Sequence, residues 1–301
     1  MSDQVWVAGE VLIDLIPGGS EYVAVVGGGP ANTAKALAKL GVTTYFIDGI
    51  STDVYGQMAK SDLLSAHVFL DYAQFSNKPT CTAKVKLSKS GTASYEFVIE
   101  GTATFDFSAP WLPDPQSKMP VLLHIGTLAT VIEPGASVLF TWAQSVAHFA
   151  PVVLDPNIRP AAVGGRAKYV KKVENWVSIS SAVKVSDEDL NWLYPGKLID
   201  EIVNKWLQVG VELVVVTLGD KGITAYRKWE RVSVDALEVV VADTVGAGDT
   251  VGAVLVEAIV NYGLDKLTGE VLKTILNRAA KAAAITVSRV GANPPSKAEL
   301  D

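Results

Sequence analysis

Short runs of apolar residues recur along the chain, and each run ends in small or polar residues. Continuous apolar runs of this length are typical of strands that are buried on both faces, as in a parallel sheet. The clearest runs are "VLLHIGT" at 121–127, "PVVLDPN" at 151–157, "AVKVSDED" at 182–189 and "LVVVTLGDKG" at 213–222. Segments with helical spacing separate them, so the pattern predicts a doubly wound, mostly parallel α/β sheet flanked by helices.

The helical segments carry start and stop signals. "PANTAKALAKLG" at 30–41 has proline at its start and glycine at its end, which is the order expected for a helix. The other helices are predicted at 62–68, 136–149, 199–210, 249–260 and 271–289. In an open α/β sheet, ligands bind at the carboxyl ends of the strands, so the polar residues that end each apolar run are candidates for a site.

Two segments alternate polar and apolar residues and do not fit this pattern. They span about 11–26 and 79–106, and the second contains a Ser-Gly turn signal at 90 and 91. Such alternation indicates antiparallel strands with one solvated face. We expect these segments to form a small β-sheet lid, inserted into a single α/β domain that spans 1–301.

The composition narrows the class of partner. A net charge of -6 disfavours nucleic-acid binding, because affinity for the phosphate backbone requires clustered Lys and Arg. A single cysteine, Cys81, excludes an internal disulfide and fits a reducing cytoplasm. No uncharged segment approaches the roughly 20 apolar residues that cross a bilayer. We therefore expect a cytoplasmic protein that acts on a small molecule and binds neither nucleic acid nor membrane.

Two glycine-rich stretches precede predicted helices. In the first, "VVGGGPANTAKAL" at 25–37, three glycines lead into a helix whose first turn carries Asn32. The stretch is either a tight turn or a place where a ligand approaches the backbone, and Asn32 supplies a donor and an acceptor for a hydroxyl-rich ligand. The P-loop motif is absent, and both near-matches to G-x-G-x-x-G fail at the last glycine, where Asn32 and Val251 stand. An oxidoreductase with a nicotinamide cofactor is therefore disfavoured.

The second stretch, "DTVGAGDTVGAVLV" at 243–256, places Asp249 at the start of an apolar helix. If residues 246–248 turn into the N-terminus of that helix, their amides and the helix dipole form a cradle for developing negative charge. A carboxylate beside such a cradle suits the acceptance of a proton from a hydroxyl that attacks a phosphate held there. The alternative is that Asp249 only caps the helix.

Together, "GGGPANTAKALAKLG" and "DTVGAGD" resemble the two signatures of the PfkB, or ribokinase-like, family of sugar kinases, and the resemblance covers essentially the whole chain. It implies the ribokinase-like fold and the ATP-dependent phosphorylation of a sugar hydroxyl. By this resemblance Asp249 is the catalytic base. The amides of Gly246, Ala247 and Gly248 are implied to form the anion hole for the transferring phosphoryl group. The residues implied to bind the sugar are Gly28, Gly29, Asn32 and, from the lid, Asp14.

The resemblance also implies a nucleotide site. "TLGDKG" is similar to the family's nucleotide loop. Thr217, Gly219 and Gly222 are therefore expected to line the phosphates and ribose of ATP, with Asn277 near the adenine.

Cation sites are implied in the same way. Mg²⁺ is expected to bridge the phosphates and to keep most of its waters. Where the family often has Asn-x-x-Glu, this chain has Ser186 and Asp189, and the shorter Asp189 is expected to order the metal through a water. Asp243 lies near the expected site of a monovalent cation such as K⁺.

The stretches "GEVLIDLIP", "ISTDVYGQM" and "DPNIRP" are most similar to the fructokinase branch, which implies transfer of the γ-phosphate of ATP to O6 of D-fructose. In that branch Arg159 of "DPNIRP" faces the substrate or the phosphates, where its guanidinium suits anionic oxygens. Arg159 is also the first arginine in the chain, so the lid offers only lysines such as Lys84 and Lys86 to grip an acid or a phosphate. A neutral sugar is thus favoured over ketodeoxygluconate or a sugar phosphate.

Other interpretations stay open. The acceptor can be ribose, another neutral ketose, ketodeoxygluconate or a nucleoside, whose base Tyr95 and Phe97 would contact. A protein of a different class, a non-catalytic sugar-binding regulator on the same fold, is also compatible with the sequence. The exposed edge of the lid invites strand pairing between two copies, so a homodimer through the lid is expected.

Overall fold

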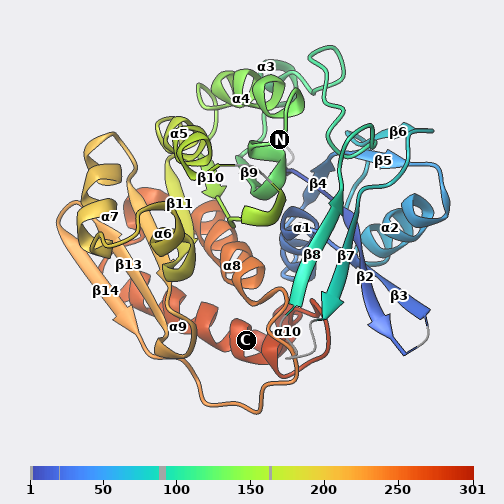
Figure 1. Ribbon diagram of the computed structural model, residues 1–301. Coiled ribbons are helices and arrows are strands. Elements are labelled where there is room, and N and C mark those ends of the chain that lie inside the picture. Colours follow the sequence, from blue (N-terminus) through green and yellow to red (C-terminus); the bar gives the residue numbers. More distant parts are fainter. Residues whose placement is uncertain (1–2, 20, 88–92, 163–164) are drawn as a thin grey trace.

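The computed structural model describes residues 3–19, 21–87, 93–162 and 165–301. An eight-stranded sheet forms its centre, in the order β4, β1, β9, β10, β11, β12, β13, β14 (Figure 1). The strands are β4 (Thr44–Ile47), β1 (Val5–Ala8), β9 (Leu122–Gly126), β10 (Val152–Asp155), β11 (Ala182–Ser186), β12 (Leu213–Thr217), β13 (Ile223–Arg227) and β14 (Glu230–Val234). All are parallel up to β12, and β13 and β14 extend the sheet as an antiparallel hairpin. The predicted doubly wound, mostly parallel sheet is confirmed.

The chain leaves the centre of this sheet in two directions. From β1 it reaches β4 at one edge, and it then returns to β9 and continues outward to β14. The carboxyl ends of β1 and β9 therefore flank the point where the strand order reverses, which is where ligands bind in open α/β sheets. Ala8 pairs with Ile125, so the loops after both strands begin at the same level.

Helices cover both faces of the sheet, which explains why its strands are continuously apolar. One face packs against α1 (Gly29–Lys39), α2 (Val54–Ser65), α8 (Ala247–Tyr262) and α9 (Gly269–Val287), and the other against α4 (Gly135–Val146), α5 (Arg166–Val177), α6 (Asp187–Leu193) and α7 (Ile199–Gln208). The short helices α3 (Pro115–Lys118) and α10 (Lys297–Leu300) lie outside these layers. Along β1, Val5 and Val7 join the core on the α8 face, whereas Trp6 and Ala8 join the core on the α4 face.

Most predicted helices are present, but their bounds differ. The helix predicted at 62–68 is the end of a longer helix, α2, which begins at Val54 because the Asp53 carboxylate caps it by accepting the Gly56 N–H at 2.7 Å. The helix predicted at 136–149 ends at Val146. Helices α5 and α6 and the short helices α3 and α10 were not predicted.

A four-stranded sheet lies beside the main one, in the order β3, β2, β7, β8 (Figure 1). Its strands are β2 (Leu12–Gly18), β3 (Glu21–Gly27), β7 (Thr82–Leu87) and β8 (Ala93–Val98). They fall within the two alternating segments; the expected turn at Ser90 and Gly91 lies outside the described residues. Strand β8 approaches the short turn Pro160–Ala162 that follows β10. We call this four-stranded sheet the lid sheet.

Two further features complete the fold. Strands β5 (Gly49–Ser51) and β6 (Gln74–Ser76) form a two-stranded parallel sheet. None of the helices in the described ranges combines the length and apolar character that a bilayer crossing requires.

Candidate active site

Asp249 lies in the first turn of α8, close to the carboxyl ends of the central strands. The helix begins at Ala247 after Gly246, whose φ of 81° favours glycine. A Cβ on Gly246 would also lie 2.7 Å from the Ala292 Cβ. Gly246 occupies the cap position, so Asp249, three residues later, is not the cap residue of α8.

The Asp249 carboxylate is buried and is held by two asparagine amides. Asp249 is only 7% exposed. Asn32 Nδ2 donates to one oxygen at 2.9 Å, and Asn157 Nδ2 donates to the other at 3.4 Å. Burial raises the pKa of Asp249 to about 6, against the lowering effects of Lys184, Asn32 and Arg159. The carboxylate is therefore mostly ionised at neutral pH, and its pKa is close enough to neutral pH for it to accept a proton.

The amides at the start of α8, where the sequence predicts a cradle for negative charge, lie in the same helical turn as this carboxylate. A helix cannot satisfy its first N–H groups internally, so Gly248 and Asp249 have no partner within α8. The Ala247 N–H makes only a long turn bond of 3.4 Å to the Thr244 carbonyl. Backbone N–H groups at the positive end of a helix dipole suit an anion.

Each of the three consecutive glycines that lead into α1 faces a different neighbour. A Cβ on Gly27 would lie 2.1 Å from Asp14 Oδ2 of the lid sheet, and one on Gly28 would lie 2.4 Å from the Glu10 carbonyl oxygen. At Gly29 a Cβ would lie 2.6 Å from Asn157 Nδ2 and 3.2 Å from Asp249 Oδ1. Gly29 therefore adjoins the space in front of the carboxylate, which only a glycine leaves open.

Two residues near that space have strained backbones and were not predicted as site residues. Thr127 has φ 56° and Asn157 has φ 38°, in the left-handed region that non-glycine residues rarely adopt. Both lie against Gly29, since its Cβ would approach Thr127 Oγ1 to 2.9 Å. Strain of this kind is typical of functional sites. The available signal was their position, because they end the apolar runs "VLLHIGT" and "PVVLDPN".

Asn32 combines the donor and acceptor roles that its side chain suggested. Its Nδ2 is engaged by Asp249, whereas its Oδ1 is buried and has no hydrogen-bond partner among the described residues. A buried acceptor without a partner costs free energy, and a ligand hydroxyl would satisfy it.

Beneath the start of α8 lies a buried ion pair that sequence reasoning missed. Lys184 Nζ lies 2.9 Å from Asp155 Oδ2, and both side chains are almost inaccessible, at 4% and 3% exposed. Lys184 is the middle residue of β11, and Asp155 is the last residue of β10. The only sequence signal was a charged residue inside each apolar run.

The lid sheet and the loop after β10 bring Asp14 and Arg159 toward the same space. Burial raises the pKa of Asp14 to about 6, and the Arg159 guanidinium opposes that rise, so the two groups interact. Arg159 also lowers the pKa of Asp249, and its Nη1 donates to the Ile158 carbonyl at 3.1 Å. The structure therefore brings together the predicted residues from three segments: Gly28, Gly29 and Asn32; Asp14; and Arg159.

The residues expected to bind the nucleotide are more dispersed. Thr217 pairs with Ser186 at the carboxyl ends of β12 and β11, and β12 lies two strands farther from β1 than β10, the strand of Asp155. Gly219 is exposed, but Gly222 is buried, and a Cβ there would lie 2.0 Å from the Val234 carbonyl oxygen. Gly222 thus has a packing reason to be glycine. Asn277 is exposed on α9.

The carboxylates expected near cations already accept backbone hydrogen bonds. Asp189 accepts from Ile158 N at 2.9 Å and from Ser186 N at 3.4 Å, and Asp243 accepts from Gly291 N at 2.9 Å and from Val245 N at 3.0 Å. Across the ranges that the structure describes, no group of three or more His, Cys, Asp or Glu side chains could hold a metal ion. Asp155 fits a Mg²⁺ ion that is bound mainly by phosphates and water, because its Oδ1 is buried, has no hydrogen-bond partner among the described residues and would accept from a metal-bound water.

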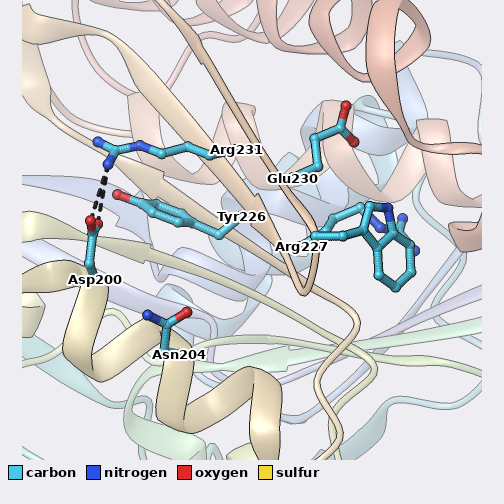
Figure 2. Close-up of a pocket in the computed structure, with 7 residues that line it drawn as sticks. Asp200, Asn204, Tyr226, Arg227, Glu230 and Arg231 are labelled. Carbon is cyan, nitrogen blue, oxygen red and sulfur yellow. Dashed lines mark hydrogen bonds and ion pairs between the residues drawn. The ribbon is translucent and has the colours of Figure 1, made fainter.

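A separate surface hollow of about 310 Å³ lies at the β13–β14 hairpin, beside α7 (Figure 2). Arg231 pairs with Asp200 at 3.2 Å across it, and Arg227 donates to the carbonyls of Leu264 and Leu267. These bonds anchor the outer edge of the sheet. The hollow contains none of the predicted site residues.

The sheet, the lid and the buried carboxylate at a helix N-terminus define a ribokinase-like fold with the site of a phosphotransferase. The chain belongs to the pfkB family of carbohydrate kinases, whose model matches residues 3–299. A fructokinase from Rhizobium leguminosarum bv. trifolii is 34% identical over 250 residues, covering 81% of this chain and 76% of the relative. A probable fructokinase-4 from Arabidopsis thaliana is 30% identical over 308 aligned positions, covering 97% and 94%.

Solved structures show the same architecture. A fructokinase from Xylella fastidiosa with bound ATP superposes with a TM-score of 0.89 at 23% identity, covering 100% of this chain and 97% of that one. A fructokinase double mutant from Vibrio cholerae O395, with fructose, ADP and a potassium ion bound, superposes with a TM-score of 0.87 at 26% identity, covering 99% and 97%. The expected fold and the resemblance to fructokinases are confirmed, and the chain is a carbohydrate kinase.

The open space at Gly29 generates a prediction. Gly29→Ala should lower kcat/KM for the sugar by at least about 10²-fold, because its methyl group would displace Asn157 and the reacting hydroxyl from Asp249. Gly252→Ala is the matched control. Gly252 lies in the same helix as Asp249, and a Cβ there would meet only His124, at 3.9 Å. The control should keep its activity and unfold at a slightly higher temperature. Steady-state kinetics and thermal unfolding of both variants measure this; equal activities would contradict it.

Proposed function

We propose that the protein transfers the γ-phosphate of ATP to the primary hydroxyl of a neutral sugar, D-fructose, to give fructose 6-phosphate. The observation that carries the proposal is the Asp249 carboxylate, buried at the N-terminus of α8 and held by Asn32 and Asn157. The relatives and the bound fructose of the Vibrio cholerae structure support the choice of sugar.

In the proposed reaction the oxygen of the sugar hydroxyl attacks the γ-phosphorus of ATP, and Asp249 accepts the proton of that hydroxyl. The oxygen–phosphorus bond to the sugar forms, the bond to the leaving ADP breaks, and the proton remains on Asp249. The amides of Gly246, Ala247 and Gly248 stabilise the negative charge of the transferring group. The sugar hydroxyls contact the backbone of Gly28 and Gly29, Asn32 Oδ1, Asp14 and Arg159.

The lid contacts favour a neutral substrate. Lys84 Nζ lies 4.4 Å from the centre of the Tyr22 ring, and Lys86 pairs with Glu96 at 2.6 Å, so both lysines are engaged within the lid sheet. Phe97 packs against the hydrophobic core, and the Tyr95 side chain lies outside the described residues. Because Lys84 and Lys86 are already engaged, the lid contacts support a hydroxyl-rich sugar over a sugar acid or a sugar phosphate. The packing of Phe97 on the core leaves it less available to contact the base of a nucleoside.

For the nucleotide and its cations we propose the family arrangement. Thr217, Gly219 and Gly222 line the phosphates and ribose, and Asn277 lies near the adenine. Asp189 would order Mg²⁺ through a water, and Asp243 would lie near a K⁺ ion; the ADP, potassium and calcium ions named for the Vibrio cholerae structures support the use of a nucleotide and of cations. Bound Mg²⁺ would supply charge neutralisation between the phosphates. Closure of the lid would exclude water and prevent ATP hydrolysis.

Removal of the proposed base gives a first test of the reaction. Asp249→Asn should reduce kcat by about 10²- to 10⁴-fold, the usual cost of losing a general base, with little change in the thermal midpoint. The measurement is ADP release with Mg-ATP for fructose, ribose, glucose, ketodeoxygluconate, fructose 6-phosphate and adenosine. Turnover of another acceptor would change the assigned substrate but keep the proposed kinase reaction. Sugar binding without turnover of any acceptor by the native protein would favour the non-catalytic regulator.

The raised pKa of Asp249 gives a second test. A base works only when ionised, so kcat/KM for fructose should fall as the pH decreases through about 6 and stay level above that value. Initial rates between pH 5 and 9 measure this limb, with coupling enzymes kept in excess at each pH. A limb near pH 4, the ordinary range of an aspartate, would contradict the assigned base.

We further propose that two copies pair through the lid sheets. The lid exposes the apolar side chains of Ile16, Tyr22, Val23 and Val98, and β3 and β8 are its edge strands. Val23, which is 54% exposed, gives the test: Val23→Glu should convert a dimer into a monomer in sedimentation equilibrium. Leu198→Glu, at a site on α7 that is 68% exposed, is the control and should leave the dimer intact. A monomeric native protein would refute this pairing.

A further inference from the structure

The buried ion pair of Lys184 and Asp155 lies on the side of the sheet that faces α8. Along β11, Val183 and Val185 pack in the core on the α4 face, so strand alternation directs Lys184 to the opposite face. Asp155 on β10 and His124 on β9 share that face by the same alternation, since Leu154 and Leu123 join the α4-side core. Three polar side chains from adjacent strands thus lie under one helix.

The Lys184 ammonium lies directly against the start of α8. A Cβ on Gly248 would be 2.7 Å from Lys184 Nζ, so the charged group touches the backbone of the proposed anion hole. The N-terminus of a helix is itself the positive end of a dipole. Burying a cation there is unfavourable unless negative charge offsets it, either from the protein or from a bound anion.

The charged groups around Lys184 are three carboxylates. Burial lowers the pKa of Lys184, but Asp155, Asp249 and Asp189 outweigh burial and raise it, so the ammonium stays charged. His124 stays neutral, because burial, and then Lys184, lower its pKa to about 3. The groups that act on Asp249 are Lys184 and Arg159, which favour its ionised form, and Asp155, which opposes it.

We propose that Lys184, held in place by Asp155, is a positioning residue for phosphoryl transfer: it keeps the Asp249 carboxylate ionised and adds a fixed positive charge at the N-terminus of α8. This inference rests on the proposed function. It assigns a role to two residues that touch neither the sugar nor the proton in flight.

The role follows from the charge balance during the reaction. Before transfer, Lys184 is balanced by Asp155 and Asp249. When Asp249 takes the proton from the hydroxyl it becomes neutral, while negative charge develops on the phosphoryl oxygens at the amides of α8. Less negative charge within the protein then balances the positive charge of Lys184. Lys184 therefore stabilises that oxyanion more strongly.

The test uses two substitutions with opposite expected signs. Lys184→Met removes the positive charge, so the acid limb of kcat/KM should move upward by about one pH unit or more, with kcat lower by about 10²-fold. Asp155→Asn removes the opposing negative charge, so the acid limb should move downward. Lys172→Met, which removes the partly buried partner of Glu133 on α5, is the matched control and should leave the limb in place. A purely structural role would lower stability in both variants without shifts of opposite sign.

A second readout does not depend on turnover. The carboxyl ¹³C resonance of Asp249, identified by its absence in Asp249→Asn, should titrate at higher pH in Lys184→Met and at lower pH in Asp155→Asn. If the native protein turns over no sugar, the proposed function fails, yet this titration still decides the interaction. An unchanged Asp249 titration in Asp155→Asn, or a shift upward, would overturn the inference.

Loss of a single partner from a buried pair often prevents folding. If Lys184→Met does not fold, the double variant Lys184→Met/Asp155→Asn removes both charges and leaves no unpaired carboxylate. Its acid limb should return toward the native value while kcat stays low, because the charge at α8 is missing. A double variant with native kcat would refute the role of Lys184 at the anion hole.

Discussion

The structure depends on the burial of one carboxylate. Asp249 is 7% exposed at the N-terminus of α8, where an ionised group loses its water shell and is costly unless other groups replace it. Two asparagine amides, the start of a helix and a buried lysine supply that replacement. Burial still raises the pKa of Asp249 to about 6, so the carboxylate is ionised near neutral pH but ready to take a proton.

The unusual backbone features of the site follow from crowding around this group. Asn157 reaches Asp249 only from a left-handed backbone, and Thr127 adopts a similar conformation at the end of the neighbouring strand. Gly29 leaves the remaining space open because any side chain would collide with Asn157. Strain and missing side chains therefore gather where a ligand must approach the carboxylate.

The lid acts on this site through charge as well as cover. Lys84 and Lys86 are engaged by Tyr22 and Glu96, whereas Asp14 reaches the environment of Arg159 from β2. In the proposed reaction these groups offer sugar hydroxyls both donors and acceptors. Asp189 supports this arrangement indirectly, because it accepts the Ile158 N–H of the loop that carries Asn157 and Arg159.

The sequence by itself determined the layers of the fold and the local chemistry of Asp249. Buried parallel strands leave continuous apolar runs, and the small residues before Asp249 indicate a helix start with free amides, so both are local patterns. The tertiary structure alone decided that Asn157, Thr127 and Lys184 belong to the site. Their roles depend on which strand lies beside which. Asn157 and Asp249 meet across 92 residues of chain, and Asp155 and Lys184 across 29, separations that local spacing cannot encode.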